Sequence, residues 1–289
     1  MEEQIKKLVE LVKEKHPERV LLQIPEGLRL KALRIAQALE NQGIETAISA
    51  EPCYGACDLR EPNKVKCDML VHIGHSKMAN TTYNTIYFPW EIDITEDLGG
   101  IDFSVIKEKK IGLLSTVQHL KMLDDVSALL KKAGKEPVIG GQILGCNTEN
   151  ADKLDVDAYL VIGSGSFHAL GVKGKVYILD LEKRNITLTD PTLLEKKRYA
   201  RIGKAKDANS FGILVSTKPG QMNMDQAIRI KKQLEERDKK AFILIMDNIT
   251  EDKLMGLKLD AFINTACPRL SDDLKITVIN ANDLNKLFE

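Results

Sequence analysis

The order of apolar and amphipathic segments along this 289-residue chain repeats three times. Each series opens with an apolar run typical of a buried strand and continues with a stretch of helical periodicity. The period is roughly 90 to 100 residues, a spacing that indicates an internal repeat of a whole supersecondary unit. The predicted opening strands are 19–24, 110–114 and 211–215.

Each opening strand is followed by a predicted helix and three more strands. Apolar strands that alternate with amphipathic helices form parallel sheets covered on both faces and joined by right-handed crossovers. We therefore predict an α/β protein of three similar small parallel-sheet domains around a central site, with domains at 1–104, 105–205 and 206–289. The predicted helices are 28–39, 122–132 and 224–238, and the later strands are 46–49, 68–73, 85–88, 137–140, 158–162, 175–179, 241–245, 261–264 and 275–279.

Three of the five cysteines follow predicted strands in different thirds of the chain: Cys57, Cys146 and Cys267. The intervals of 89 and 121 residues are far longer than the roughly two to five residues of a local zinc or redox motif. Cys57 and Cys146 follow the second strand of their series, whereas Cys267 follows the third. Loops after the carboxyl ends of parallel strands bind ligands, so the fold could bring the three thiols into one site.

Three thiolates are one short of a closed four-cysteine site, which leaves an iron-sulfur cluster with one open iron or a zinc with one open position. For each of the three cysteines, the alternative to metal binding is burial as a small apolar side chain. Cys53 and Cys57 form part of a C-x₃-C-x₂-C pattern known from radical enzymes, but position 60 is arginine. We expect Cys53 and Cys67 to pack in the interior.

The composition restricts the partners and the compartment. The chain has 42 basic and 42 acidic residues, so no global field attracts nucleic acid or an anionic membrane, and we expect neither partner. No uncharged apolar run reaches the ~18 residues of a membrane helix, and residues 1–20 lack a secretory core. We expect a cytoplasmic protein, where an odd cysteine count favours metal ligands, catalytic thiols or buried thiols over disulfides.

Five short motifs, in order along all three series, resemble those of the archaeal 2-(3-amino-3-carboxypropyl)histidine synthases of diphthamide biosynthesis. The Tyr-Gly-Ala-Cys-Asp and Gly-His-Ser elements, about 20 residues apart, make the resemblance specific. The motifs are Pro25-Glu26-Gly27-Leu28, Pro52-Cys53-Tyr54-Gly55-Ala56-Cys57-Asp58-Leu59, His72-Ile73-Gly74-His75-Ser76, Gly141-Gln142-Ile143-Leu144-Gly145-Cys146-Asn147 and Ala266-Cys267-Pro268-Arg269.

The resemblance implies a transferase that acts as a homodimer. Each subunit would hold a [4Fe-4S] cluster through Cys57, Cys146 and Cys267, with S-adenosylmethionine (SAM) at the fourth iron and an electron donor supplying the reducing equivalent. The implied reaction is a radical cleavage between the sulfur and the aminocarboxypropyl carbon of SAM. The 3-amino-3-carboxypropyl group then joins carbon 2 of a histidine imidazole in elongation factor 2.

SAM needs hydrogen-bond partners for its amino acid end, and strand-end loops supply candidates. Glycine-rich turns bring backbone N–H groups close to a carboxylate, and an arginine two residues after Cys267 offers a cation for it. Ordinary turns and a surface ion pair are the alternatives. The predicted cofactor-binding residues are Gly163, Ser164, Gly165, Gly220, Gln221 and Arg269.

Three histidines end or follow the third strands of the first two series: His72, His75 and His168. Any of them could position the protein substrate or donate to the cluster, although lone histidines are more often ordinary hydrogen-bonding residues. His75 is the candidate catalytic residue, because its loop matches the Gly-His-Ser element.

A dense basic stretch lies between the second and third series, at Lys196, Lys197, Arg198, Arg201, Lys204 and Lys206. Such a run is typical of a solvated linker, and its docking of elongation factor 2 is a hypothesis. Two other functions remain open: a quinolinate synthase-like [4Fe-4S] enzyme with small substrates, and a non-catalytic metal-binding partner subunit.

Overall fold

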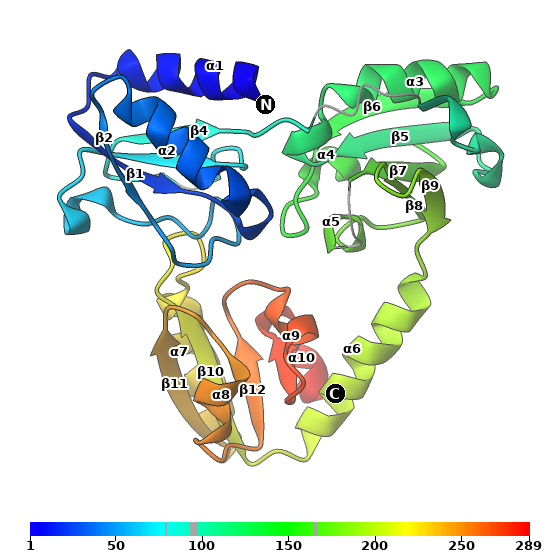
Figure 1. The fold of residues 1–289 in the computed structure, drawn as a ribbon. Helices are drawn as coiled ribbons and strands as arrows, with labels where there is room; N and C mark the ends of the chain where they lie inside the picture. The colour runs from blue at the N-terminus through cyan, green and yellow to red at the C-terminus, as the bar shows by residue number, and fades with distance from the viewer. Residues whose placement is uncertain (79, 93–97, 164–166) are drawn as a thin grey trace. The chain divides into compact units, whose positions relative to one another are not determined.

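The computed structural model describes residues 1–78, 80–92, 98–163 and 167–289. The chain divides into two compact units, Met1–Thr189 and Asp190–Glu289 (Figure 1). The first unit contains two sheets and the second unit contains one.

The first sheet has the strand order β2-β1-β3-β4, with all neighbours parallel. Helices α1 and α2 pack on one face through an apolar cluster that includes Leu8, Val12, Ile35 and Leu39. The elements are α1 Glu2–Lys13, β1 Arg19–Gln23, the 3-10 helix η1 Glu26–Lys31, α2 Ala32–Glu40, β2 Glu45–Ile48, η2 Pro62–Val65, β3 Met69–Ile73 and β4 Thr85–Phe88.

The second sheet has the order β6-β5-β7-β8-β9, in which only β9 is antiparallel to its neighbour. Helix α3 packs on one face through Val126 and Leu130. The elements are η3 Leu98–Gly100, η4 Phe103–Val105, β5 Lys110–Ser115, η5 Val117–His119, α3 Met122–Lys132, β6 Glu136–Gln142, α4 Glu149–Asp152, β7 Ala158–Ile162, α5 Phe167–Leu170, β8 Val176–Asp180 and β9 Asn185–Leu188.

The second unit has a parallel sheet of order β11-β10-β12-β13. Its core gathers Ile202 and Ala205 of α6 with Ile230 and Leu234 of α7. The elements are α6 Pro191–Lys206, β10 Ser210–Ser216, α7 Met224–Glu235, β11 Lys240–Met246, α8 Glu251–Met255, β12 Ala261–Asn264, α9 Leu270–Asp273, β13 Val278–Asn280, η6 Ala281–Asp283 and α10 Leu284–Leu287.

All three sheets share one topology, in which the first strand lies between the second and third. The predicted α/β fold with three similar, mostly parallel sheets is confirmed. The boundaries at residues 104/105 and 205/206 remain a prediction. Because the chain reverses its direction of winding between the first and third strands, the crevice at their carboxyl ends is the expected ligand position in each sheet.

One aspartate contact recurs in every sheet. Asp68, Asp157 and Asp260 each stand directly before the third strand, and each Oδ2 accepts the backbone N–H of the first strand's first residue, at 2.8 Å. The backbone N–H of each aspartate donates back to that residue's carbonyl, at 2.9, 2.9 and 3.2 Å. Equivalent side chains therefore fix the start of the first strand against the third, which is independent support for an internal triplication.

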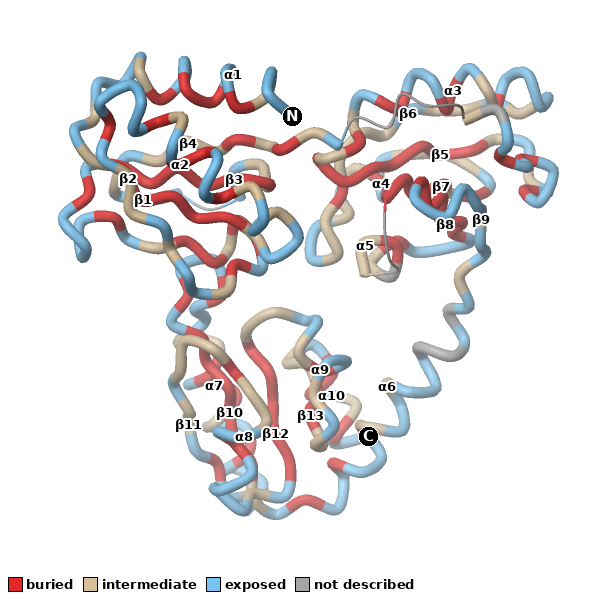
Figure 2. Tube along the Cα trace, viewed as in Figure 1, coloured by how far each residue is buried: buried red, intermediate tan, exposed pale blue. Residues whose placement is uncertain are grey.

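The burial pattern follows the sheets. Central strands β1, β3, β5 and β10 are buried along most of their length, whereas helices alternate between buried and exposed positions (Figure 2). This alternation is expected where amphipathic helices cover a sheet. Over the described residues, no helix combines the length and apolar character needed to cross a membrane.

Among the longer elements and the sheet strands, β9 and α6 differ from the sequence prediction. Strand β9 was not predicted, because as an edge strand with mostly exposed side chains it lacks an apolar run.

The basic stretch predicted to be a linker forms the 16-residue helix α6. Arg198 of this helix contacts both oxygens of Asp283 through Nε, at 2.8 and 2.9 Å, and Arg201 pairs with Asp272 at 2.8 Å. Pairing within the second unit, together with the buried Ile202 and Ala205, stabilises the helix.

Candidate functional site

Cys57 lies in the loop that follows β2, at the carboxyl-end edge of the first sheet. A Cβ atom on Gly55 would lie 3.4 Å from Cys57 Sγ, so the backbone passes close to this sulfur. The next residue, Asp58, is fully buried, and its carbonyl oxygen accepts a hydrogen bond of 2.7 Å from Gln23 Nε2 at the end of β1. The loop carrying Cys57 is therefore anchored to the central strand.

Cys146 lies in a tight turn after β6. Leu144 and Asn147 close the turn through two backbone hydrogen bonds of 2.9 and 3.0 Å. A Cβ on Gly145 would lie 2.6 Å from the ring of Phe167 and 2.8 Å from its carbonyl oxygen, so a side chain cannot fit there without displacement. The Gly145 N–H donates to His168 Nδ1 at 3.1 Å. Helix α5 thus holds the turn that presents Cys146.

Cys57 lies close enough to Cys146 to influence the ionisation of the Cys146 thiol. The pKa of the Cys146 thiol is raised, first by loss of hydration around the sulfur and second by the neighbouring Cys57. Cys146 as a whole residue is nevertheless exposed. Two of the three predicted cluster ligands are therefore brought together within the first unit, from two different sheets.

Cys267 belongs to the second unit, in the loop after β12. The buried Asn264 shapes this loop: its Nδ2 donates to Cys267 O at 2.8 Å, and its Oδ1 accepts the Ala266 N–H at 2.9 Å. The prediction that Cys267 follows the third strand of its series is confirmed. Its role as a ligand remains a prediction.

Two histidines and a glutamine form a hydrogen-bonded chain at the carboxyl end of the first sheet. Gln23 and His72 are register partners on β1 and β3, the two strands between which a ligand crevice is expected. Gln23 Oε1 lies 3.0 Å from His72 Nδ1, and His72 Nε2 lies 3.0 Å from His75 Nδ1. The chain therefore runs from the interior towards the Gly-His-Ser loop.

The Gly-His-Ser loop is held on both sides by glutamines of the second sheet's domain. Gln118 Nε2 donates to the Gly74 carbonyl at 2.6 Å, and Gln142 Nε2 donates to Ser76 Oγ at 2.6 Å. Gly74 has φ +88°, and a Cβ there would lie 2.9 Å from Pro25 Cγ. Glycine is required at this position, and His75 is fixed between the two sheets of the first unit.

Both histidines are held neutral. Burial, with a smaller contribution from the nearby His75, lowers the pKa of His72 to about 3. Burial also lowers the pKa of His75 to about 4, with a smaller contribution from His168. Loss of hydration disfavours the imidazolium in each case. His168 therefore lies within electrostatic range of His75, although the two come from different sheets.

The remaining cysteines of the first unit are buried. Cys67 packs with Leu21, Leu59 and Leu70, in line with its predicted interior position, and burial raises the pKa of its thiol. Cys53 is also buried, and its Sγ lies within 4.8 Å of one ring nitrogen each of His72 and His75. These three donors form a group that could hold a metal ion.

The predicted SAM-binding residues that the structure describes lie in three separate segments of the chain. The Gly163 N–H donates to Leu179 O at 3.2 Å, whereas Ser164 and Gly165 fall outside the described residues. In the second unit, Gly220 is exposed and Gln221 is buried after β10. Arg269 is exposed, and its Nε pairs with Asp273 at 2.9 Å. Their contacts with SAM remain predictions.

Comparison with known proteins identifies the family. The model of the family described as "Putative diphthamide synthesis protein" matches residues 24–275, which is most of the chain. The chain belongs to this family. The match includes all three cysteines and the Gly-His-Ser loop, and it favours the diphthamide family over a quinolinate synthase-like enzyme.

Members of the diphthamide family from distant organisms align with most of the chain. The 2-(3-amino-3-carboxypropyl)histidine synthase of Pyrococcus horikoshii is 38% identical over 88% of this chain and 80% of its own length. Subunit 1 of the synthase of Caenorhabditis elegans is 31% identical over 88% of this chain and 70% of its own length. A crystal structure of Dph2 from Pyrococcus horikoshii with a 4Fe-4S cluster superposes with a TM-score of 0.89, at 35% identity, over 98% of this chain and 89% of that chain.

Several polar residues at the strand ends of this diphthamide-family chain were missed by sequence reasoning. Gln23 stands inside an apolar run, and only its register with His72 shows its role. Lys218 is a buried lysine after β10, and its Nζ donates to Asn248 Oδ1 at 2.8 Å. A lysine directly after a predicted strand, in Ser216-Thr217-Lys218-Pro219, is a signal that could have drawn attention to it.

Proposed function

We propose that this protein catalyses the first step of diphthamide biosynthesis. It transfers the 3-amino-3-carboxypropyl group of SAM to carbon 2 of a histidine imidazole in elongation factor 2. Membership of the diphthamide family carries the proposal, together with the retention of Cys57, Cys146 and Cys267 in strand-end loops. The names of the Pyrococcus and Caenorhabditis relatives support a transferase of the aminocarboxypropyl group.

The donor set of the site fits an iron-sulfur cluster. Cys57 and Cys146 are sulfur donors from two loops that interact electrostatically, and Cys267 is the third. Three thiolates on a [4Fe-4S] cluster leave one iron free for a substrate, and the related Pyrococcus structure contains a 4Fe-4S cluster. When bound, the cluster supplies the electron that cleaves SAM between the sulfur and the aminocarboxypropyl carbon.

The protein's own residues orient the cosubstrate and exclude water. Gln221 and Arg269 stand in the loops after β10 and β12, where a ligand is expected for this topology. Arg269 is a candidate to bind the SAM carboxylate. It would then give up its exposed ion pair with Asp273, and an exposed ion pair contributes little to stability. Ser164, Gly165 and Gly220 keep their proposed role of backbone N–H donors, whereas Gly163, whose N–H donates to Leu179 O, is proposed only to let the ligand approach the backbone closely.

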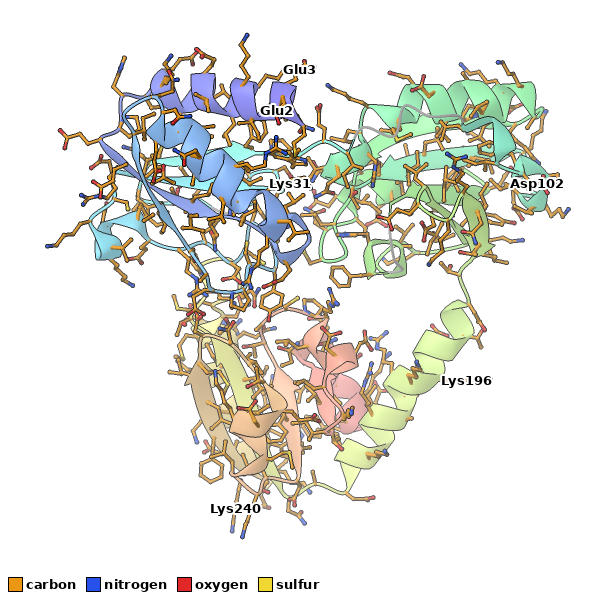
Figure 3. All side chains as sticks on the ribbon, in the orientation of Figure 1. Glu2, Glu3, Lys31, Asp102, Lys196 and Lys240 are labelled. Carbon is orange, nitrogen blue, oxygen red and sulfur yellow. The ribbon has the colours of Figure 1, made fainter. Side chains whose placement is uncertain are left out.

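Elongation factor 2 is the proposed protein substrate, and helix α6 is its proposed docking surface. Lys196, which is labelled on this helix in Figure 3, and Lys197, Lys204 and Lys206 are exposed, whereas Arg198 and Arg201 are used in ion pairs of the second unit. Reversal of the four lysines to glutamate should raise the Michaelis constant for elongation factor 2. An unchanged constant would exclude this docking surface.

We also infer a cytoplasmic homodimer that takes its reducing equivalent from a one-electron donor protein. Leu30 and Leu33, which are 98% and 75% exposed on the η1–α2 segment, support a self-association surface. The relatives named subunit 1 are consistent with an assembly of more than one chain. Sedimentation of the wild-type protein beside Leu30→Glu tests this inference. A monomeric wild type would contradict it.

The reaction is tested by incubating the reduced, reconstituted protein with SAM under anaerobic conditions. We expect 5′-methylthioadenosine as the nucleoside product, because the adenosyl carbon stays on sulfur. Formation of 5′-deoxyadenosine instead would mean that the wrong sulfur–carbon bond breaks and would contradict the proposal.

A further inference from the structure

In the hydrogen-bonded series Gln23–His72–His75 of the first sheet, only one assignment of donors and acceptors is possible. A backbone carbonyl only accepts, so Gln23 must present its Nε2 to Asp58 O and its Oε1 to His72. His72 therefore carries its proton on Nδ1 and has a lone pair on Nε2. That lone pair accepts from His75 Nδ1, which must then be protonated. Neutral His75 is left with an unprotonated Nε2.

Burial makes this assignment costly to reverse. Gln23 and His72 are both fully buried, so a flipped amide would place oxygen against oxygen at 2.7 Å with no water to compensate. An unsatisfied buried group costs about 1–3 kcal/mol, and a polarised chain strengthens each of its bonds. Because the pKa of both rings is lowered, neither takes up a second proton near neutral pH.

The far end of this hydrogen-bonded chain lies near the turn that carries Cys146. His75 is partly exposed, and its loop is bonded to Gln142 of β6, four residues before Cys146. His168, whose Nδ1 accepts the N–H of Gly145, lies within electrostatic range of His75. Among the residues that the structure describes, no group is hydrogen-bonded to His75 Nε2.

We propose that His75 Nε2 is the acceptor that binds the ring N–H of the substrate imidazole. The proposal rests on the proposed function, in which carbon 2 of a histidine ring is the reacting atom. Carbon 2 is bonded to both ring nitrogens of the substrate. When His75 holds one of these nitrogens by a hydrogen bond, it also fixes the position of the adjacent carbon 2. Gln23 and His72 are positioning residues, which hold His75 in the accepting tautomer.

A metal ion on Cys53, His72 and His75 is the competing explanation of the same cluster. Two nitrogens on a tetrahedral zinc at 2.0–2.1 Å would be about 3.3 Å apart and could not share a proton. The observed 3.0 Å between the two rings is an ordinary hydrogen-bond distance. The second nitrogen of His72 is also oriented by Gln23, as the hydrogen-bonded chain requires. The geometry favours the chain over the metal.

Nitrogen-15 NMR of histidine-labelled protein tests the tautomers without any cluster or activity. The chain has only five histidines, so variants such as His16→Gln can assign each ring. We expect His72 and His75 with the proton on Nδ1, whereas His168 should carry it on Nε2. A proton on His75 Nε2, or zinc retained by the purified protein and lost in Cys53→Ala, would overturn the proposal.

Kinetics then test binding of the substrate. His75→Leu should raise the Michaelis constant for elongation factor 2 about three- to tenfold, the effect of one lost hydrogen bond, and leave that for SAM within about twofold. Gln23→Leu should return His75 to a mixture of tautomers, and because Gln23 also anchors the Cys57 loop this variant is read by NMR and not by kinetics. His16→Gln, an exposed imidazole, is the matched control.

The two proposals fail in different ways. If wild-type protein cleaves SAM and modifies the factor while His75→Leu keeps the same Michaelis constants, the role of His75 is wrong and the proposed function stands. If wild-type protein neither cleaves SAM nor modifies the factor, the proposed function fails. The NMR result then still decides whether the accepting tautomer is built into the fold.

Discussion

His72 Nε2 lies 3.0 Å from His75 Nδ1, a hydrogen-bond distance, and the two residues stand on opposite sides of the turn at Gly74. The contact exists because β3 ends at Ile73 and a glycine with positive φ reverses the chain at once. A buried strand residue is thereby connected to a loop that contacts the second sheet's domain. The burial of His72 and the partial burial of His75 make stability depend on pH, and the positive φ at Gly74 makes the turn sensitive to a side chain there.

Stability should fall as the pH is lowered. The folded-state pKa values of about 3 for His72 and about 4 for His75 lie below the value of about 6.5 in an unfolded chain. The unfolded state therefore binds more protons from about pH 6.5 down to about pH 4 for His75 and about pH 3 for His72, so the stability contributed by each ring is complete above pH 6.5 and is lost progressively below it. Each histidine contributes up to about 1.4 kcal/mol per pH unit.

Urea unfolding at a series of pH values measures this effect. His72→Gln should lower the pH slope of the unfolding free energy by about one proton, and His16→Gln, at an exposed histidine, is the matched substitution for comparison. Equal slopes in the wild type and His72→Gln would show that His72 is protonated in the folded protein.

Gly74→Ala should destabilise the first unit. The position has φ +88°, and a new Cβ would lie 2.9 Å from Pro25 Cγ. We expect a loss of about 1–3 kcal/mol in the free energy of unfolding. Gly27→Ala is the matched control, because nothing lies within 4 Å of its Cβ position. A cost no larger than that of the control would mean that the turn can relax.

Gly145→Ala should reduce the retention of iron. Its Cβ would lie 2.6 Å from Phe167 and would displace the turn that presents Cys146. We expect less iron per chain after anaerobic reconstitution, measured by a colorimetric assay. Gly203→Ala on α6 adds a methyl group in open space and should leave iron content unchanged, with a gain in stability of up to about 1 kcal/mol. Wild-type iron content in Gly145→Ala would contradict the role of this turn.

The cysteines should separate into two groups. Cys57→Ala, Cys146→Ala and Cys267→Ala should each lose most of the iron, sulfide and charge-transfer absorbance of the reconstituted protein. Cys67→Ala should keep them, because this thiol is buried among Leu21, Leu59 and Leu70. Equal loss in Cys67→Ala would show that the ligand set is wrong.

The sequence was sufficient to predict the parts of the fold that depend on apolar runs. Strands β1, β5 and β10 and helices α3 and α7 lie close to their predicted positions, because each buries a continuous run or one helical face. The exposed edge strand β9 offers no such pattern. Helix α6 was missed because its charged residues obscure the few that are buried.

The site was less predictable, because its contacts depend on register between distant strands. Cys57 and Cys146 were predicted from strand-end position, and the two loops that carry them follow strands of two separate sheets. Gln23 and His72 are 49 residues apart, and only the pairing of β1 with β3 reveals their contact. The same holds for the aspartates that join the first and third strands of each sheet.

The most direct test of the central claim is the mass of elongation factor 2 after anaerobic incubation with the reduced, reconstituted protein and SAM. We predict a gain of one 3-amino-3-carboxypropyl group, localised by fragmentation to a single histidine, together with an equal amount of 5′-methylthioadenosine. Factor whose target histidine is replaced by lysine should gain nothing. If a verified, reduced cluster left both SAM and the factor unchanged, this chain alone would not be the transferase, and a partner-subunit role would replace the proposed one.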